Sequence, residues 1–103
     1  MPQEVFEYHA DAYDDWFGVH RKVYRAECES IRRALPAPDA RTVEVGVGSG
    51  RFAVSLGIPV GIEPSVALGQ MARRRGIEVI RGVEESLPLK DESCSSVLMV
   101  TVI

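Results

Sequence analysis

The chain has 103 residues, of which 46% are hydrophobic and 26% are charged, and its formal net charge is −3. This length allows one small domain with a single core, and the composition is that of an ordinary soluble globular domain, which excludes a disordered, collagen-like or disulfide-rich chain. The slight negative charge gives no support for nucleic acid as a partner, because binding to phosphates relies on a basic surface.

The N-terminal third of the chain predicts two helices. Apolar and aromatic residues recur at spacings of three and four over approximately residues 2–17, which is the pattern of a short amphipathic helix. A second helical pattern covers residues 20–35 and is ended by Pro36 and Pro38, since proline cannot continue a helix. We expect residues 1–38 to form a helical cap on the rest of a single domain.

The remaining residues, 39–103, alternate short apolar runs with helical patterns. The apolar runs, which predict strands, are residues 41–45, 58–63, 77–81 and 96–103. Helices are expected at residues 51–56 and 66–75, the second with Ser65 as its N-cap and Gly76 as its end. Strands that alternate with helices form a parallel sheet with right-handed crossovers, so we predict an α/β core.

A glycine-rich segment, EVGVGSG over residues 44–50, stands where the first predicted strand turns into a helix. Glycines at such a turn let the backbone bend tightly and approach a nucleoside-containing ligand closely. The dinucleotide fingerprint would have a third glycine at the position of Arg51, which disfavours a nicotinamide cofactor. A phosphate-binding P-loop would need Lys and then Ser or Thr after Gly50, where this chain has Arg51 and Phe52.

Glu63 ends the second predicted strand, 17 residues after Gly46. An acidic side chain near this distance can accept both hydroxyls of an unphosphorylated ribose. Taken singly, the glycines can be a tightly packed turn and Glu63 can be a solvated carboxylate. Their combination in one strand-helix-strand unit favours a ligand site.

Four segments, in order, resemble the class I (Rossmann-like) S-adenosylmethionine-dependent methyltransferases, especially the small-molecule branch: VEVGVGSGRF, GIEPS, GVEESLPLKDES and the strand SVLMV. That family has a parallel sheet of about seven strands, and the resemblance covers the first four, with strand order 3-2-1-4. It implies a truncated fold that holds the cofactor-binding half. Members usually have Ser-Phe-Asp where this chain has Ser93-Cys94-Ser95.

The resemblance also implies which residues bind S-adenosylmethionine: Glu44, Gly46, Gly48, Gly50, Glu63, Pro64, Val83, Glu84 and Leu87. In this assignment Glu44 lies near the methionine portion, the glycines form the floor, and Glu63 holds the ribose. Val83 occupies a position where the family often has an Asp for the adenine, and Glu84 or backbone groups are the substitutes. The aromatic residues Tyr13, Trp16 and Phe17 resemble a lid, although core packing is the favoured interpretation.

The resemblance implies a methyltransferase that transfers a methyl group from S-adenosylmethionine to a small-molecule acceptor. No catalytic residue is assigned, because methyl transfer mainly needs in-line approach and exclusion of water. His9 and His20 lack a metal-binding pattern, and Cys28 and Cys94 are expected to be reduced thiols in a cytoplasmic protein with no membrane segment.

Two other functions stay open. The chain can be a truncated, non-catalytic module that acts by binding the cofactor or a protein, and a nucleotide-binding oxidoreductase module is the least favoured. In the order 3-2-1-4, residues 97–103 would lie at an open sheet edge. We expect a second copy in a homo-oligomer, a partner chain or the remainder of a longer chain to cover that edge.

Overall fold

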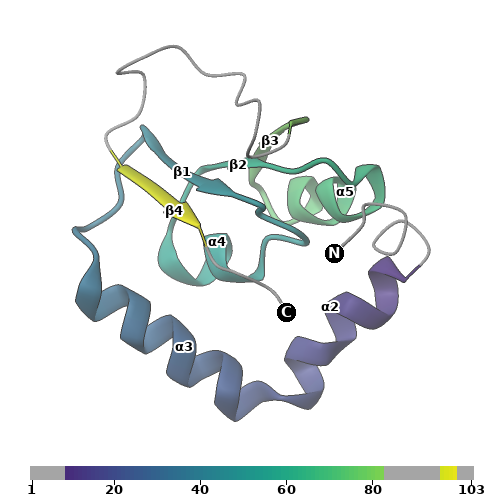
Figure 1. Cartoon of the computed structure of the whole chain (residues 1–103), viewed down its shortest axis with the longest axis horizontal. Coiled ribbons are helices and arrows are strands. Elements are labelled where there is room, and N and C mark those ends of the chain that lie inside the picture. Colours follow the sequence, from purple (N-terminus) through teal and green to yellow (C-terminus); the bar gives the residue numbers. More distant parts are fainter. Residues whose placement is uncertain (1–8, 83–95, 100–103) are drawn as a thin grey trace.

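A computed structural model describes residues 9–82 and 96–99 of the chain (Figure 1). The elements in chain order are α2 (Ala10–Val19), α3 (Arg21–Ala34), β1 (Thr42–Val45), α4 (Arg51–Leu56), β2 (Val60–Ile62), α5 (Val66–Arg74), β3 (Glu78–Ile80) and β4 (Ser96–Met99). The predicted α/β class is confirmed, and each predicted helix and strand has a counterpart among these elements.

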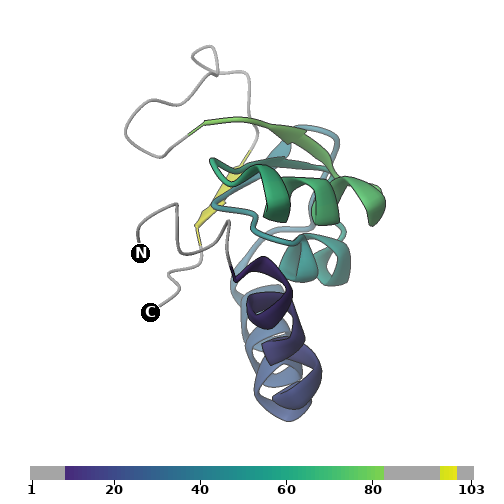
Figure 2. The ribbon, with the colours of Figure 1, turned by 90° about the vertical axis from the view of Figure 1, so that its right-hand side faces the viewer.

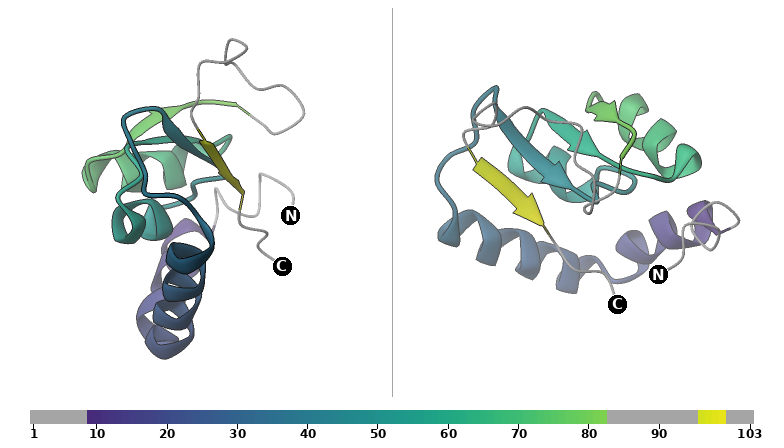
Figure 3. Two further views of the ribbon diagram at one scale, coloured as in Figure 1. Left: turned by 90° about the vertical axis from the view of Figure 1, so that its left-hand side faces the viewer. Right: turned by 45° about the horizontal axis from the view of Figure 1, so that its top comes forward.

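The four strands form one parallel sheet in the order β3-β2-β1-β4, as predicted (Figure 3). Val45 at the end of β1 pairs with Ile62 on β2 and with Met99 on β4, and Ile62 pairs with Ile80 on β3. The carboxyl ends of the strands are therefore level with one another. The loops that follow β1 and β2 leave the same edge of the sheet, which brings the glycine-rich segment next to Glu63.

The two faces of the sheet have different neighbours. On one face, α4 and α5 pack against the strands through a buried cluster that includes Ala53, Ala72 and Val79 (Figure 2). On the other face, Val43 and Ile62 belong to a cluster made of strand residues alone. Because side chains alternate along a strand, Glu44 lies on the face that α4 covers.

The N-terminal helices are fixed to the core by an aromatic cluster around Phe17. This buried ring makes edge-to-face contacts with Tyr13, Tyr24 and Phe52, with ring centroids 5.3 to 5.7 Å apart. Trp16 is 41% exposed and stacks on the ring of His20. Phe17 thus belongs to the core, as the core-packing interpretation expects, whereas Trp16 lies at the surface.

The ends of several elements differ from the predicted ones. Helix α2 continues past Gly18 to Val19, since one glycine costs a helix only about 1 kcal/mol. The paired parts of β2 and β3 are three residues each, shorter than the predicted apolar runs. The predicted residues 2–8 and 100–103 lie outside the described part of the chain. None of the described helices is both long enough and apolar enough to cross a membrane.

Ser65 caps α5, as predicted, because its Oγ accepts a hydrogen bond from the Leu68 N–H at 3.1 Å. We expect Ser65→Ala to lower the free energy of unfolding by about 1 kcal/mol, since the Leu68 N–H loses its acceptor. Urea denaturation measures this change. Ser30→Ala, at an exposed position of α3, is the control and should change stability by less than about 0.5 kcal/mol. Equal losses in both variants would contradict the capping role.

Candidate functional site

The loop between β1 and α4 turns sharply because three of its residues have positive φ angles: Gly46 at 72°, Gly48 at 59° and Gly50 at 88°. Side chains are disfavoured in this conformation. A Cβ atom on Gly48 would lie 3.2 Å from the hydroxyl oxygen of Tyr13, and one on Gly50 would lie 3.1 Å from the Cα of Ala72. The glycines therefore permit both the turn and the close approach of α2 and α5.

The same loop lies directly on β2. The N–H groups of Gly46 and Val47 both donate to the Ile62 carbonyl, at 2.8 and 3.1 Å. Gly61 makes room for this contact, since a Cβ atom there would lie only 2.5 Å from the Val47 side chain. Gly61 was not singled out from the sequence, because nothing in the local pattern of β2 indicates that a loop packs against it.

Glu63 holds the loop from the end of β2. Its side chain is buried, with Oε1 accepting from the Gly48 N–H at 2.8 Å and Oε2 accepting from the Ser65 N–H at 2.9 Å. Glu63 therefore links the glycine loop to the start of α5, a structural role that its sequence position did not predict.

Two buried polar atoms near this loop have no hydrogen-bond partner among the described residues: Oε1 of Glu44 and Oγ of Ser49. Both residues are 1% exposed. Burial raises the pKa of Glu44 to about 8, and the charge of Glu63 adds to the shift, while a backbone hydrogen bond from Ala53 opposes it. Unpartnered buried polar groups are rare in folded proteins and are frequently completed by a ligand or water.

Tyr13 brings the N-terminal helices to this site. Burial raises its pKa to about 12, with the negative charges of Glu63, Glu44 and Asp14 adding to the shift. The phenol is therefore protonated at neutral pH and lies against Gly48. The sequence placed Tyr13 in an aromatic helix but could not say which of its aromatic residues reaches the loop.

The structure brings five of the predicted site residues together at the carboxyl ends of β1 and β2: Glu44, Gly46, Gly48, Gly50 and Glu63. Pro64 is half-buried between Glu63 and Ser65. Val83, Glu84 and Leu87 lie outside the described residues, so their predicted contacts with an adenine ring stay predictions.

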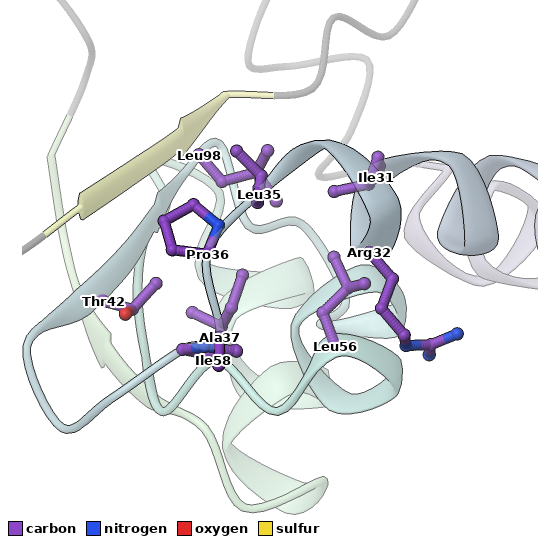
Figure 4. Close-up of a pocket in the computed structure, with 10 residues that line it drawn as sticks. Ile31, Arg32, Leu35, Pro36, Ala37, Thr42, Leu56, Ile58 and Leu98 are labelled. Carbon is purple, nitrogen blue, oxygen red and sulfur yellow. The ribbon is translucent and has the colours of Figure 1, made fainter.

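A separate cavity of about 330 Å³ lies near the start of β1, away from the glycine loop (Figure 4). Helices α3 and α4, strand β4 and residues 35–38, which follow α3, bound this cavity. Its polar side chains among the described lining residues are Arg32 and Thr42, and the others, including Leu35 and Leu98, are apolar. The cavity is thus distinct from the cluster around Glu63.

Comparison with known proteins relates the chain to methyltransferases, although no protein-family model matches it. It is 47% identical to a SAM-dependent methyltransferase of Thermotoga maritima, described as a possible histamine N-methyltransferase; the match covers 96% of this chain and 47% of that chain, with a TM-score of 0.90. It is 39% identical over 99 residues to an uncharacterised protein of Methanocaldococcus jannaschii, covering 96% of this chain and 47% of that protein.

A SAM-dependent methyltransferase of Thiobacillus denitrificans, solved in complex with S-adenosyl-L-homocysteine, shares the fold with a TM-score of 0.55 and 24% identity. That match covers 75% of this chain and 36% of the other. The chain thus spans about half the length, or less, of the proteins that it matches.

Proposed function

We propose that this chain, which has the fold of the class I S-adenosylmethionine-dependent methyltransferases over the first four strands of their sheet, binds S-adenosylmethionine at the glycine loop between β1 and α4. The observation that carries the proposal is the placement of Glu63, whose buried carboxylate lies at the end of β2 and is hydrogen-bonded to Gly48. This is the edge of a parallel sheet at which nucleoside-containing ligands bind.

The donors and acceptors around the loop fit this ligand. Glu63 lies at the end of β2, where a carboxylate can accept the two hydroxyls of a ribose, and its negative charge disfavours a 2′-phosphate. Gly46 has no side chain, and nothing lies within 4 Å of the position that its Cβ atom would take, so the backbone that would form the floor is uncovered there. Oε1 of Glu44, which has no hydrogen-bond partner among the residues that the structure describes, is proposed to meet a polar group of the methionine portion.

When bound, S-adenosylmethionine supplies the activated methyl group of its sulfonium. The residues of the chain bind and orient the cofactor and exclude water, which can provide a large share of the acceleration in a displacement of this kind. We propose a small molecule as the methyl acceptor, in line with the branch of the family that the motifs resemble. A further strand, from a second copy or another chain, is proposed to cover β4, which has β1 as its one neighbour in the described sheet.

Isothermal titration of the protein with S-adenosylhomocysteine tests the proposed site. We expect micromolar affinity, and no heat beyond dilution with NAD, because Arg51 occupies the position of the third fingerprint glycine. A protein that is folded by circular dichroism and binds neither ligand would contradict the proposal and favour a non-catalytic interaction module. Light scattering in the same buffer gives the oligomeric state.

A further inference from the structure

A network of charged side chains joins α2 to α4 and α5. The Asp14 carboxylate, on α2, accepts from Nε of Arg51 at 2.9 Å through Oδ1, and from Arg51 and Arg75 at 3.1 and 2.9 Å through Oδ2. Arg51 is the first residue of α4, and Arg75 directly follows the last residue of α5. One carboxylate therefore connects three helices.

The network continues to the backbone of the glycine loop. The second terminal nitrogen of Arg75 donates to the Ser49 carbonyl at 2.8 Å. Ser49 lies between Gly48 and Gly50, which both have positive φ angles. The Arg75 guanidinium thus spans the distance from Asp14 to the centre of the loop.

The charges in this network are partly shielded from solvent. The side chain of Asp14 is 13% exposed, and those of Arg51 and Arg75 are 31% and 29% exposed. Burial raises the pKa of Asp14, but the hydrogen bonds from Arg51 and Arg75 outweigh it and hold the pKa below its ordinary value. Asp14 is therefore a carboxylate at neutral pH, and it offsets the unfavourable positive charge of Arg51 at the start of a helix.

We propose that Asp14 is a positioning residue for the cofactor site: it holds Arg75 against the Ser49 carbonyl and thereby fixes the glycine loop. Glycines have many accessible backbone conformations, so a loop rich in them gains most from such a tether. Tyr13, the residue before Asp14, lies against Gly48 in the same loop. The effect of Asp14 on cofactor affinity rests on the proposed function. Its effect on the conformation of the glycine loop can be measured in the ligand-free protein.

Amide hydrogen exchange of the ligand-free protein tests the tether. In Asp14→Asn we expect the amides of Gly48, Ser49 and Gly50 to exchange about tenfold faster, because the local opening of the loop becomes easier. The amides of Val45 and Ile62, in the strands, should keep their rates. Unchanged rates at the three loop residues, or an equal rise at the strand residues, would overturn the proposal.

Glu29→Gln is the matched control, because Glu29 also forms ion pairs with two arginines, Arg32 at 2.9 Å and Arg33 at 3.3 Å, but at an exposed site on α3. It should leave the loop amides unchanged. Arg75→Met, which keeps the contact between Asp14 and Arg51, should accelerate the same amides as Asp14→Asn. Adding Asp14→Asn to Arg75→Met should then have less effect than Asp14→Asn alone, and full additivity would contradict an action through Arg75.

Titration with S-adenosylhomocysteine provides the second measurement. We expect Asp14→Asn to raise the Kd roughly tenfold, because the variant must order the loop on binding, while Glu29→Gln keeps the wild-type value. If Asp14→Asn binds S-adenosylhomocysteine with the wild-type Kd, the positioning role is overturned. If the wild-type protein itself does not bind, the proposed function fails, and the exchange rates still decide whether Asp14 fixes the loop.

Discussion

Replacing Glu63 by alanine is expected to weaken the binding of S-adenosylhomocysteine and to destabilise the fold at the same time. The variant loses the acceptor proposed for the ribose hydroxyls, which weakens binding by about 1–3 kcal/mol. It also leaves the N–H groups of Gly48 and Ser65 without their acceptors, at about 1–3 kcal/mol each if they stay buried. Titration calorimetry and urea denaturation measure the two effects.

Glu63→Gln separates binding from stability if the alanine variant does not fold. Its amide retains one acceptor oxygen for a loop N–H but turns an NH₂ group toward the other, so the loss of stability should be smaller than for alanine. Glu78→Ala, at an exposed position of β3, is the control and should leave both quantities unchanged within about 0.5 kcal/mol. If a folded Glu63 variant binds S-adenosylhomocysteine with wild-type affinity, Glu63 does not bind the ribose.

Replacing Glu44 by glutamine is expected to remove a pH dependence of stability. The pKa of Glu44 is about 8 in the folded protein, against an ordinary value of 4.5. As the pH rises between these values, the unfolded chain releases this proton while the folded chain keeps it. The free energy of unfolding of the wild-type protein should therefore fall by up to ~1.4 kcal/mol per pH unit in that window, and this contribution should level off above the folded pKa.

Glutamine stays neutral at every pH, so Glu44→Gln should come close to the wild-type protein near pH 4, below the ordinary pKa, and exceed its stability by a few kcal/mol at pH 8. Urea denaturation at both values measures the difference. The control is Glu27→Gln, at an exposed position of α3, which should leave the wild-type pH dependence in place. Parallel curves for the wild-type protein and Glu44→Gln would show that Glu44 does not carry this proton.

The order of helices and strands could be predicted from the sequence because local signals mark it. Residues 51–56 were expected to be a helix and form α4, and Ser65 was expected to cap α5 and does so. Alternation of strands with helices also predicted the strand order, since right-handed crossovers allow few arrangements. The candidate positions of Glu63 and the three loop glycines follow from the same local patterns.

The contacts that shape the site depend on residues far apart in the chain, and only the tertiary structure decided them. Asp14 lies 37 residues before Arg51 and 61 before Arg75, and no periodicity pairs these charges. Likewise, Oε1 of Glu44 lacks a hydrogen-bond partner among the described residues because the side chain is buried by packed elements, which its neighbours in sequence do not reveal. Local propensity thus determined which elements form, while packing determined which side chains meet and which charges are shielded from water.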